Sequence, residues 1–267
     1  TPNGFFTPPS TPGLLPLTYK ISVGSCEVSS TITINMIPAK WQQVAGSNVS
    51  KDIGDDVQVD VSGNVYVTGR IGNNAIFGAP NNTTIISGGL LWANSLPNRG
   101  LSLVLDMNQQ NIIVCGGGNG FAFLSSYDEN GIQNWVETMN TATSTVKALA
   151  TSIDRDDNDQ IYITGYYGNH LTFNGNPALS GLGPRDGFVA QYDPLNNIWV
   201  SIKQLRTMMS GGEIIPRGIA VDNAGTTVYV GGSYINTSSF AGVILSGSGP
   251  FISEHAVGSS LNGTVAI

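Results

Sequence analysis

One short pattern occurs four times in this chain and constrains its fold more than any other feature. Each copy is an apolar, β-branched run that ends in glycine, and the copies are residues 64–69, 111–116, 160–165 and 227–232. Such a run predicts a strand that is buried on both faces. Each final glycine is preceded, nine to eleven residues earlier, by an aspartate that ends another apolar run: Asp60, Asp106, Asp154 and Asp222. A unit of this size that recurs is a supersecondary repeat.

Two further runs complete each repeat. One follows the pattern Phe-x-x-x-Tyr-Asp at residues 123–128 and 188–193. Residues 251–255 occupy the same position of the fourth repeat and match the pattern only in part. The other starts at a tryptophan. The four tryptophans, each 14 to 23 residues before a repeat aspartate, are Trp41, Trp92, Trp135 and Trp199.

Four short strands joined by tight turns are typical of a propeller blade. We therefore expect an all-β protein, a β-propeller of four-stranded antiparallel blades with at least four repeats visible. A helical solenoid is excluded because no long stretch has a 3.6-residue apolar period. We expect the strand at Trp41 to close the ring by pairing with the last blade, which would protect an open sheet edge.

The composition supports turn-rich β structure and excludes two classes of partner. Only 11% of the residues are charged and 34 are glycine, which supplies the positive-φ corners of tight turns. The net charge of −7 and the isoelectric point near 4.6 argue against nucleic acid and against a polybasic membrane anchor. No apolar run is long enough to span a bilayer, so we expect no membrane insertion.

The first 39 residues differ from the rest. Prolines punctuate an extended lead, and two alternating runs, residues 17–23 and 30–37, flank a turn around Gly24. This arrangement predicts a β-hairpin, which needs a sheet to join because a lone hairpin is marginal in water. Residues 38–40 then read as a linker. Both ends of the chain look internal, so we expect a segment of a longer polypeptide.

These patterns resemble two known kinds of module. Residues 59–69, and residues 186–193 followed by Trp199, resemble the SBBP-type β-propeller repeat of secreted and cell-surface bacterial proteins. The resemblance covers roughly residues 41–257; the first repeat lacks the Phe-x-x-x-Tyr-Asp run and the fourth lacks its closing tryptophan. Residues 4–8, 18–21 and 26–34 resemble the end of the immunoglobulin-like or PKD-like modules of very large Bacteroidota-type surface proteins. That resemblance implies that Cys26 would pair with a cysteine on an earlier strand.

The densest acidic stretch is residues 154–160. Asp154, Asp156 and Asn158 have the 1-3-5 spacing of a calcium loop, but Asp159 stands where the loop needs glycine and Gly165 where it needs an acidic residue. The sister turns carry no such cluster. We therefore interpret the stretch as a hairpin turn one residue longer than its sisters, with a calcium site as the alternative.

The remaining reactive residue types fit structural roles better than catalytic ones. The repeat aspartates would accept N–H bonds from the turns that follow them. His255 replaces a repeat tyrosine and is predicted to be a packed ring; His170 is predicted to lie in a loop. Cys115 is predicted to be a buried, inert thiol, and the glycine-rich residues 116–120 a flexible turn between strands.

Binding is expected on loops, because a rigid scaffold presents them. Two insertions depart from the repeat, residues 166–184 and 205–213. The repeat tryptophans and tyrosines could stack on sugars, but their periodic positions favour packing between blades.

We therefore expect two domains, residues 1–39 from an immunoglobulin-like module and residues 40–267 forming the propeller. The alternative for residues 1–39 is an N-terminal extension that packs on the main domain. The expected function is a non-enzymatic structural and adhesion module, secreted or on the cell surface, that presents blade loops to a glycan, to a protein or to other modules of its polypeptide. The alternatives are a glycan lyase or hydrolase with its site at the propeller axis, and a calcium-dependent lectin. No residue is assigned as catalytic, cofactor-binding or metal-binding, and no cofactor is expected.

Overall fold

The computed structural model describes residues 13–23, 26–36, 45–46, 53–70, 76–77, 99–236, 238–240, 243–257 and 263–266. Every regular element in this part of the chain is a β-strand, which confirms the all-β prediction. The chain divides into two compact units, Thr1–Ala45 with Phe77–Thr83, and Gly46–Ile76 with Thr84–Ile267. Each unit is described by itself.

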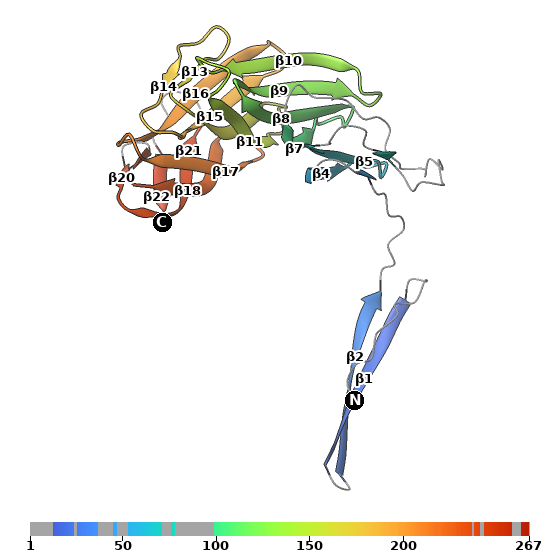
Figure 1. Cartoon of the computed structure of the whole chain (residues 1–267). Coiled ribbons are helices and arrows are strands. Elements are labelled where there is room, and N and C mark those ends of the chain that lie inside the picture. The colour runs from blue at the N-terminus through green and yellow to red at the C-terminus, as the bar shows by residue number, and fades with distance from the viewer. Residues whose placement is uncertain are drawn as a thin grey trace. The chain divides into compact units, whose positions relative to one another are not determined.

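The first unit contains the predicted hairpin, drawn in blue in Figure 1. Strands β1 (Gly13–Val23) and β2 (Cys26–Met36) pair antiparallel along their whole length, from Gly13 opposite Met36 to Val23 opposite Cys26. Both strands are longer than the alternating runs that predicted them, because β1 continues at the open end of the hairpin and β2 begins closer to the turn.

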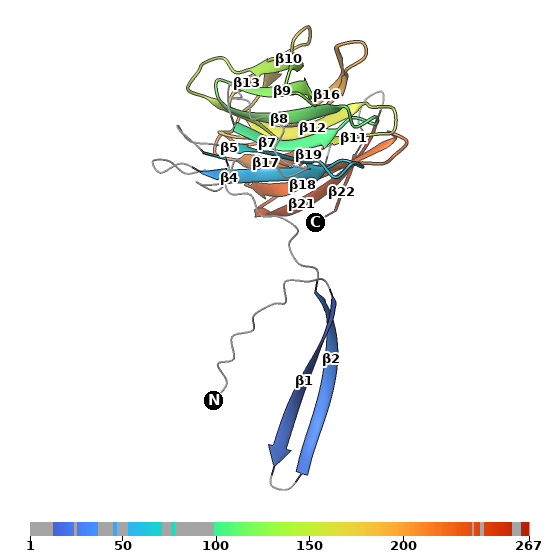
Figure 2. The same cartoon turned by 90° about the vertical axis from the view of Figure 1, so that its right-hand side faces the viewer.

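The second unit contains the four repeats, and its strands run alongside one another in both views (Figure 1, Figure 2). Repeat 1 has β4 (Ile53–Val59) and β5 (Val65–Arg70). Repeat 2 has β7 (Arg99–Leu105), β8 (Asn111–Asn119), β9 (Phe121–Asp128) and β10 (Gln133–Asn140). Repeat 3 has β11 (Lys147–Arg155), β12 (Ile161–Tyr167), β15 (Asp186–Asp193) and β16 (Ile198–Thr207). Repeat 4 has β17 (Glu213–Val221), β18 (Thr227–Ile235), β21 (Ser248–Ala256) and β22 (Gly263–Ala266).

Short strands lie outside the repeats. They are β3 (Ala45–Gly46), β6 (Ile76–Phe77), β13 (His170–Leu171), β14 (Leu179–Ser180), β19 (Ser238–Phe240) and β20 (Val243–Leu245).

Repeats 2, 3 and 4 are antiparallel meanders in which each strand pairs with the next strand of its own repeat. The predicted four-stranded unit is therefore present three times, and repeat 1 shows its first two strands. The sheets of repeats 2 and 3 are joined by a short pairing of β8 with β11. The described sheets stay open and do not close into a propeller ring. Trp41, the expected closing strand, lies outside the described residues, as does Trp92.

A β-bulge occurs at the same place in the first strand of every repeat. The unpaired residue stands five positions before the aspartate that closes the first turn, and the four residues are Asp55, Leu101, Thr151 and Arg217. A bulge bends its strand and leaves one residue out of the ladder. Its recurrence shows that the first two strands of all four repeats are structurally equivalent, which the sequence pattern alone only suggested.

The bulge explains the glycine that ends each recurring run. Gly69, Gly116, Gly165 and Gly232 each lie opposite the residue just before the bulge. In all four, a Cβ atom would overlap a carbonyl oxygen of the bulged strand, for example that of Leu149 at Gly165. Glycine is required here by the close approach of two backbones.

The core consists of three apolar clusters, each between consecutive repeats. Tyr66 of repeat 1 packs with Leu103, Leu105 and Val114 of repeat 2. Repeats 2 and 3 enclose the largest cluster, which contains Ile113 and Ile163, and Tyr162 joins repeat 3 to repeat 4 in the last cluster. Consecutive stacking explains why the second strands of repeats 2 and 3 are apolar on both faces.

Two details of the prediction are wrong. Trp135 lies opposite Ser126 whereas Trp199 lies opposite Tyr192, so the tryptophans do not hold equivalent ladder positions. Both rings instead converge on Tyr192, with centroids 5.1 and 4.9 Å away. The predicted glycine-rich turn at 116–120 is mostly strand, since β8 runs to Asn119 and its glycines let the backbone of β11 approach.

Candidate functional site

The repeat aspartates close the turns between the first two strands of each repeat. Asp60 accepts hydrogen bonds from the Asn64 backbone at 2.8 Å and from the Tyr66 hydroxyl at 3.1 Å. Burial disfavours the charged form of Asp60, but its bonds to Asn64 and Tyr66 outweigh that effect and lower its pKa. Asp106 and Asp222 accept equivalent backbone bonds from their own turns. These carboxylates are structural, as predicted.

In repeat 3 the turn-closing residue is Asp156, and the assignment of Asp154 to this role is wrong. Asp156 accepts bonds from the backbone of Asn158 and Gln160 and, at 3.1 Å, from the Tyr162 hydroxyl, which repeats the contact between Tyr66 and Asp60. Its backbone N–H bonds the Gln160 carbonyl, as that of Asp60 bonds Asn64. The turn is therefore as long as that of repeat 1 and not one residue longer than its sisters. The apolar run ends two residues before strand β11 does. The end of the run therefore points to Asp154 as the turn-closing residue, although the strand itself leads to Asp156.

The acidic stretch does not assemble a metal site. Asp154 accepts a bond from the backbone of Val221 in repeat 4, and Asp159 accepts one from Met107 in the turn of repeat 2. The carboxylates of Asp154, Asp156 and Asp159 therefore accept hydrogen bonds from three different parts of the fold. Among the described residues no group of three or more His, Cys, Asp or Glu side chains is placed to hold a metal ion.

His255 holds the ladder position that Tyr127 and Tyr192 hold in repeats 2 and 3. It is buried, and its Nε2 lies 2.8 Å from the Ser253 hydroxyl. Burial, with a smaller effect of Lys203, lowers the pKa of His255. The prediction that His255 is a packed ring at the position of a repeat tyrosine is confirmed.

The other two candidates also have structural settings. Cys115 is a free, fully buried cysteine, and burial raises the pKa of its thiol far above the usual value, so it stays protonated. His170 begins β13, a two-residue strand paired with β14 in the first insertion. Cys26 lies in β2, and nothing in the described contacts bears on its pairing.

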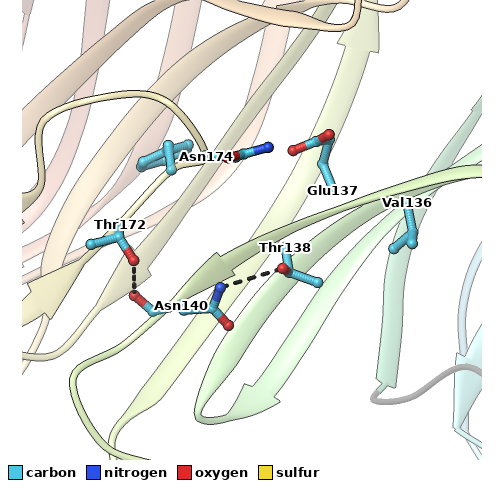
Figure 3. A pocket seen from close by; sticks show the side chains of 7 residues that line it. Val136, Glu137, Thr138, Asn140, Thr172 and Asn174 are labelled. Atoms are coloured by element: carbon cyan, nitrogen blue, oxygen red, sulfur yellow. Dashed lines mark hydrogen bonds between the residues drawn. The ribbon is translucent and has the colours of Figure 1, made fainter.

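The candidate binding site is a groove of about 290 Å³ between β10 and the first insertion. Figure 3 shows its side chains, with the amide of Asn174 and the carboxylate of Glu137 pointing toward each other. The lining residues are Val136, Glu137, Thr138, Asn140, Thr172, Phe173 and Asn174. The groove thus combines one carboxylate, two amides and two hydroxyls with the apolar residues Val136 and Phe173.

The insertion is held in place by two of its own apolar residues. Leu171 and Phe173 are buried in the cluster between repeats 2 and 3, where the Phe173 ring meets Trp199 edge-on with centroids 5.0 Å apart. Thr172 and Asn140 exchange two backbone hydrogen bonds across the groove, and the Thr172 hydroxyl donates a third. The lining residues of the insertion are therefore fixed against β10.

Glu137 is the one ionisable side chain of the groove. Its side chain lies on the inward face of β10 together with Met139, yet none of the described residues donates a hydrogen bond to its carboxylate. The charge of Glu137 adds to burial in raising the pKa of Tyr192 to about 12. A largely buried carboxylate without a protein donor is suited to accept hydrogen bonds from a ligand.

The second insertion forms a different kind of surface. Met208 and Met209 are exposed at its tip. Asp186 is fully buried below it and accepts backbone bonds from Leu182, Gly183 and Thr207, so this carboxylate ties both insertions to repeat 3.

Sequence reasoning found the insertion that forms half of the groove but missed Glu137 and Asn140 on β10. The signal was available for Glu137, because alternation places it in the inward phase of that strand between Trp135 and Met139. Asn140 gave no signal.

Neither a protein family model nor a curated protein matches this chain. In the described part of the chain, no helix is long and apolar enough to cross a membrane.

Proposed function

We propose that this chain is a non-enzymatic structural and adhesion module, displayed outside the cell, whose groove at Glu137 binds a glycan. The observation that carries the proposal is the composition of that groove. A carboxylate, two amides and two hydroxyls surround a space of about 290 Å³ on an element held rigid by the core. Sugar hydroxyls both donate and accept hydrogen bonds, and this set of side chains complements them.

The repeat architecture supports a scaffold role. Repeats that stack on one another through apolar clusters fit the arrangement of propeller blades, and we propose that they form an arc of a β-propeller of the SBBP type. The β1–β2 hairpin would belong to an immunoglobulin-like neighbour. An isoelectric point near 4.6 and a surface rich in Ser, Thr, Asn and Gly agree with an extracellular setting.

The groove favours binding over glycan cleavage. Glycoside hydrolases generally use a pair of carboxyl groups that flank the scissile bond. The lining of this groove contains one carboxylate, Glu137, beside neutral amides and hydroxyls. Binding without turnover is therefore the activity that these side chains support best.

A glycan array with the purified chain, in the presence and absence of calcium, tests the proposal. We expect binding that is independent of calcium and that is lost in Glu137→Gln and in Asn174→Ala. Glu129→Gln is the matched control, because Glu129 is an exposed carboxylate outside the groove. Polysaccharide turnover would overturn the non-enzymatic role, and binding that survives both groove variants would place the glycan elsewhere.

A further inference from the structure

The three internal interfaces between repeats use the same residue positions. We call the glycine that ends each recurring run, opposite the bulge, the bulge glycine. One side of each interface, the forward face, contains the residue three positions before that glycine, which is Tyr66, Ile113 or Tyr162. On the other side, the rear face of the next repeat contributes residues of its first two strands, such as Leu103, Leu105 and Val114 in repeat 2. Each repeat therefore carries both halves of one interface.

The rear face of repeat 1 is uncovered. Val57, Val59 and Val67 hold the positions of Leu103, Leu105 and Val114, as the common bulge register shows. The three valines are 55–58% exposed, whereas their counterparts in repeat 2 are at most 9% exposed. Val57 and Val67 are direct cross-strand partners, so these side chains form one continuous apolar surface.

The forward face of repeat 4 is uncovered as well. Tyr229 holds the position of Tyr162, and Ile252 holds that of Val189, opposite the residue before the bulge glycine. Tyr229 and Ile252 are 45% and 57% exposed, whereas Tyr162 and Val189 are 2% and 4% exposed. Repeat 4 thus presents to solvent the surface that repeat 3 buries against repeat 4.

We propose that the rear face of repeat 1 in one copy of this chain docks on the forward face of repeat 4 in a second copy. Such a contact would continue an interface that already occurs three times inside the molecule. The two open faces are its complementary halves, and both are exposed in this chain, so a second copy offers each face the partner that its counterparts have inside the molecule. A contact between two different faces is heterologous, so assembly closes into a ring or continues as a filament.

Sedimentation of the full chain over about 1–200 μM tests this inference. We expect association that grows with concentration. Val67→Glu and Ile252→Glu should each weaken it at least about tenfold, because each buries an unpaired charge in the contact. Both side chains are exposed in the single chain, so the thermal midpoint of each variant measured at low concentration should stay near that of the wild type. Leu195→Glu, at an exposed apolar position in a turn, is the matched control and should associate normally.

Mixing the two variants makes the test specific for a head-to-tail contact. The Val67→Glu chain keeps an intact forward face and the Ile252→Glu chain keeps an intact rear face, so the mixture should form a dimer that contains one of each and grows no further. A chain that stays monomeric up to 200 μM would overturn the proposal. Loss of association in only one variant, without recovery on mixing, would also overturn it, since that pattern requires a contact between identical faces.

Discussion

The carbonyl oxygen of Leu149 occupies the space that a Cβ atom on Gly165 would need. The same relationship joins Arg99 to Gly116 and Ile53 to Gly69. The bulge turns that carbonyl toward the neighbouring strand, and only glycine leaves room for it. A recurring glycine that reads as a strand end in the sequence is therefore the partner of a bulge on another strand.

Gly165→Ala should lower the free energy of unfolding by about 2–4 kcal/mol, because the new methyl group must displace the backbone of β11. Gly218→Ala is the control, since no atom lies within 4 Å of a Cβ built there. Urea denaturation measures both variants. Equal stabilities for the two would contradict the role assigned to the bulge.

Asp156→Ala should cost about 2–3 kcal/mol of stability, because it removes the buried carboxylate that accepts hydrogen bonds from two backbone N–H groups and from the Tyr162 hydroxyl. Asp157→Ala, at the exposed neighbouring position, should change stability by less than about 0.5 kcal/mol. Thermal or urea melts compare the two. A harmless Asp156 variant would refute its assignment as the turn-closing residue.

The free energy of unfolding should fall as the pH drops below about 6.5, which is the unperturbed pKa of histidine. The pKa of His255 is depressed in the folded state, so the unfolded chain takes up a proton at a higher pH than the folded chain does. The contribution of neutral His255 to stability is present above the pKa that this residue has in the unfolded chain. It is lost as the pH falls toward the lower pKa that His255 has in the folded chain. His255→Tyr, which installs the residue of repeats 2 and 3, should flatten the curve of unfolding free energy between pH 7 and pH 5. A variant with the wild-type slope would assign the effect to another group.

Removal of divalent metal should leave the melting temperature unchanged within about 2 °C, because Asp154, Asp156 and Asp159 are bonded to three different parts of the fold. Calorimetry with EDTA, and again with added calcium, provides the measurement. A larger shift on calcium addition would restore the calcium-loop interpretation.

The repeat and its strands could be predicted from the sequence because periodic apolar runs report burial directly. Phe251 and His255 were recognised as degenerate copies of the Phe and Tyr positions, and both lie on the expected rungs. The turn-closing aspartate of repeat 3 was misplaced by two residues, because two candidates, Asp154 and Asp156, stand beside one turn and only backbone pairing distinguishes them.

Other features depend on three-dimensional relationships that no local pattern records. The convergence of Trp135 and Trp199 on Tyr192 joins two repeats, and the groove at Glu137 joins β10 to residues of an insertion that lie more than thirty positions later in the chain. Closure of the array depends on the angle between successive repeats. Nothing in the repeat pattern encodes that angle.

The turns at one edge of the array are linked in series. The Val61 N–H donates to the Gln109 side chain and the Met107 N–H donates to Asp159, so each turn is completed by the repeat that follows it. Both acceptor residues hold the same turn position with positive φ. These linkages join only nearest neighbours, so unfolding of one repeat should destabilise the adjoining repeat first. Unfolding should then proceed from one repeat to the next along the array. Insertion or deletion of a whole repeat would then preserve the kind of contact that links neighbouring turns, so the array could change length in steps of one repeat.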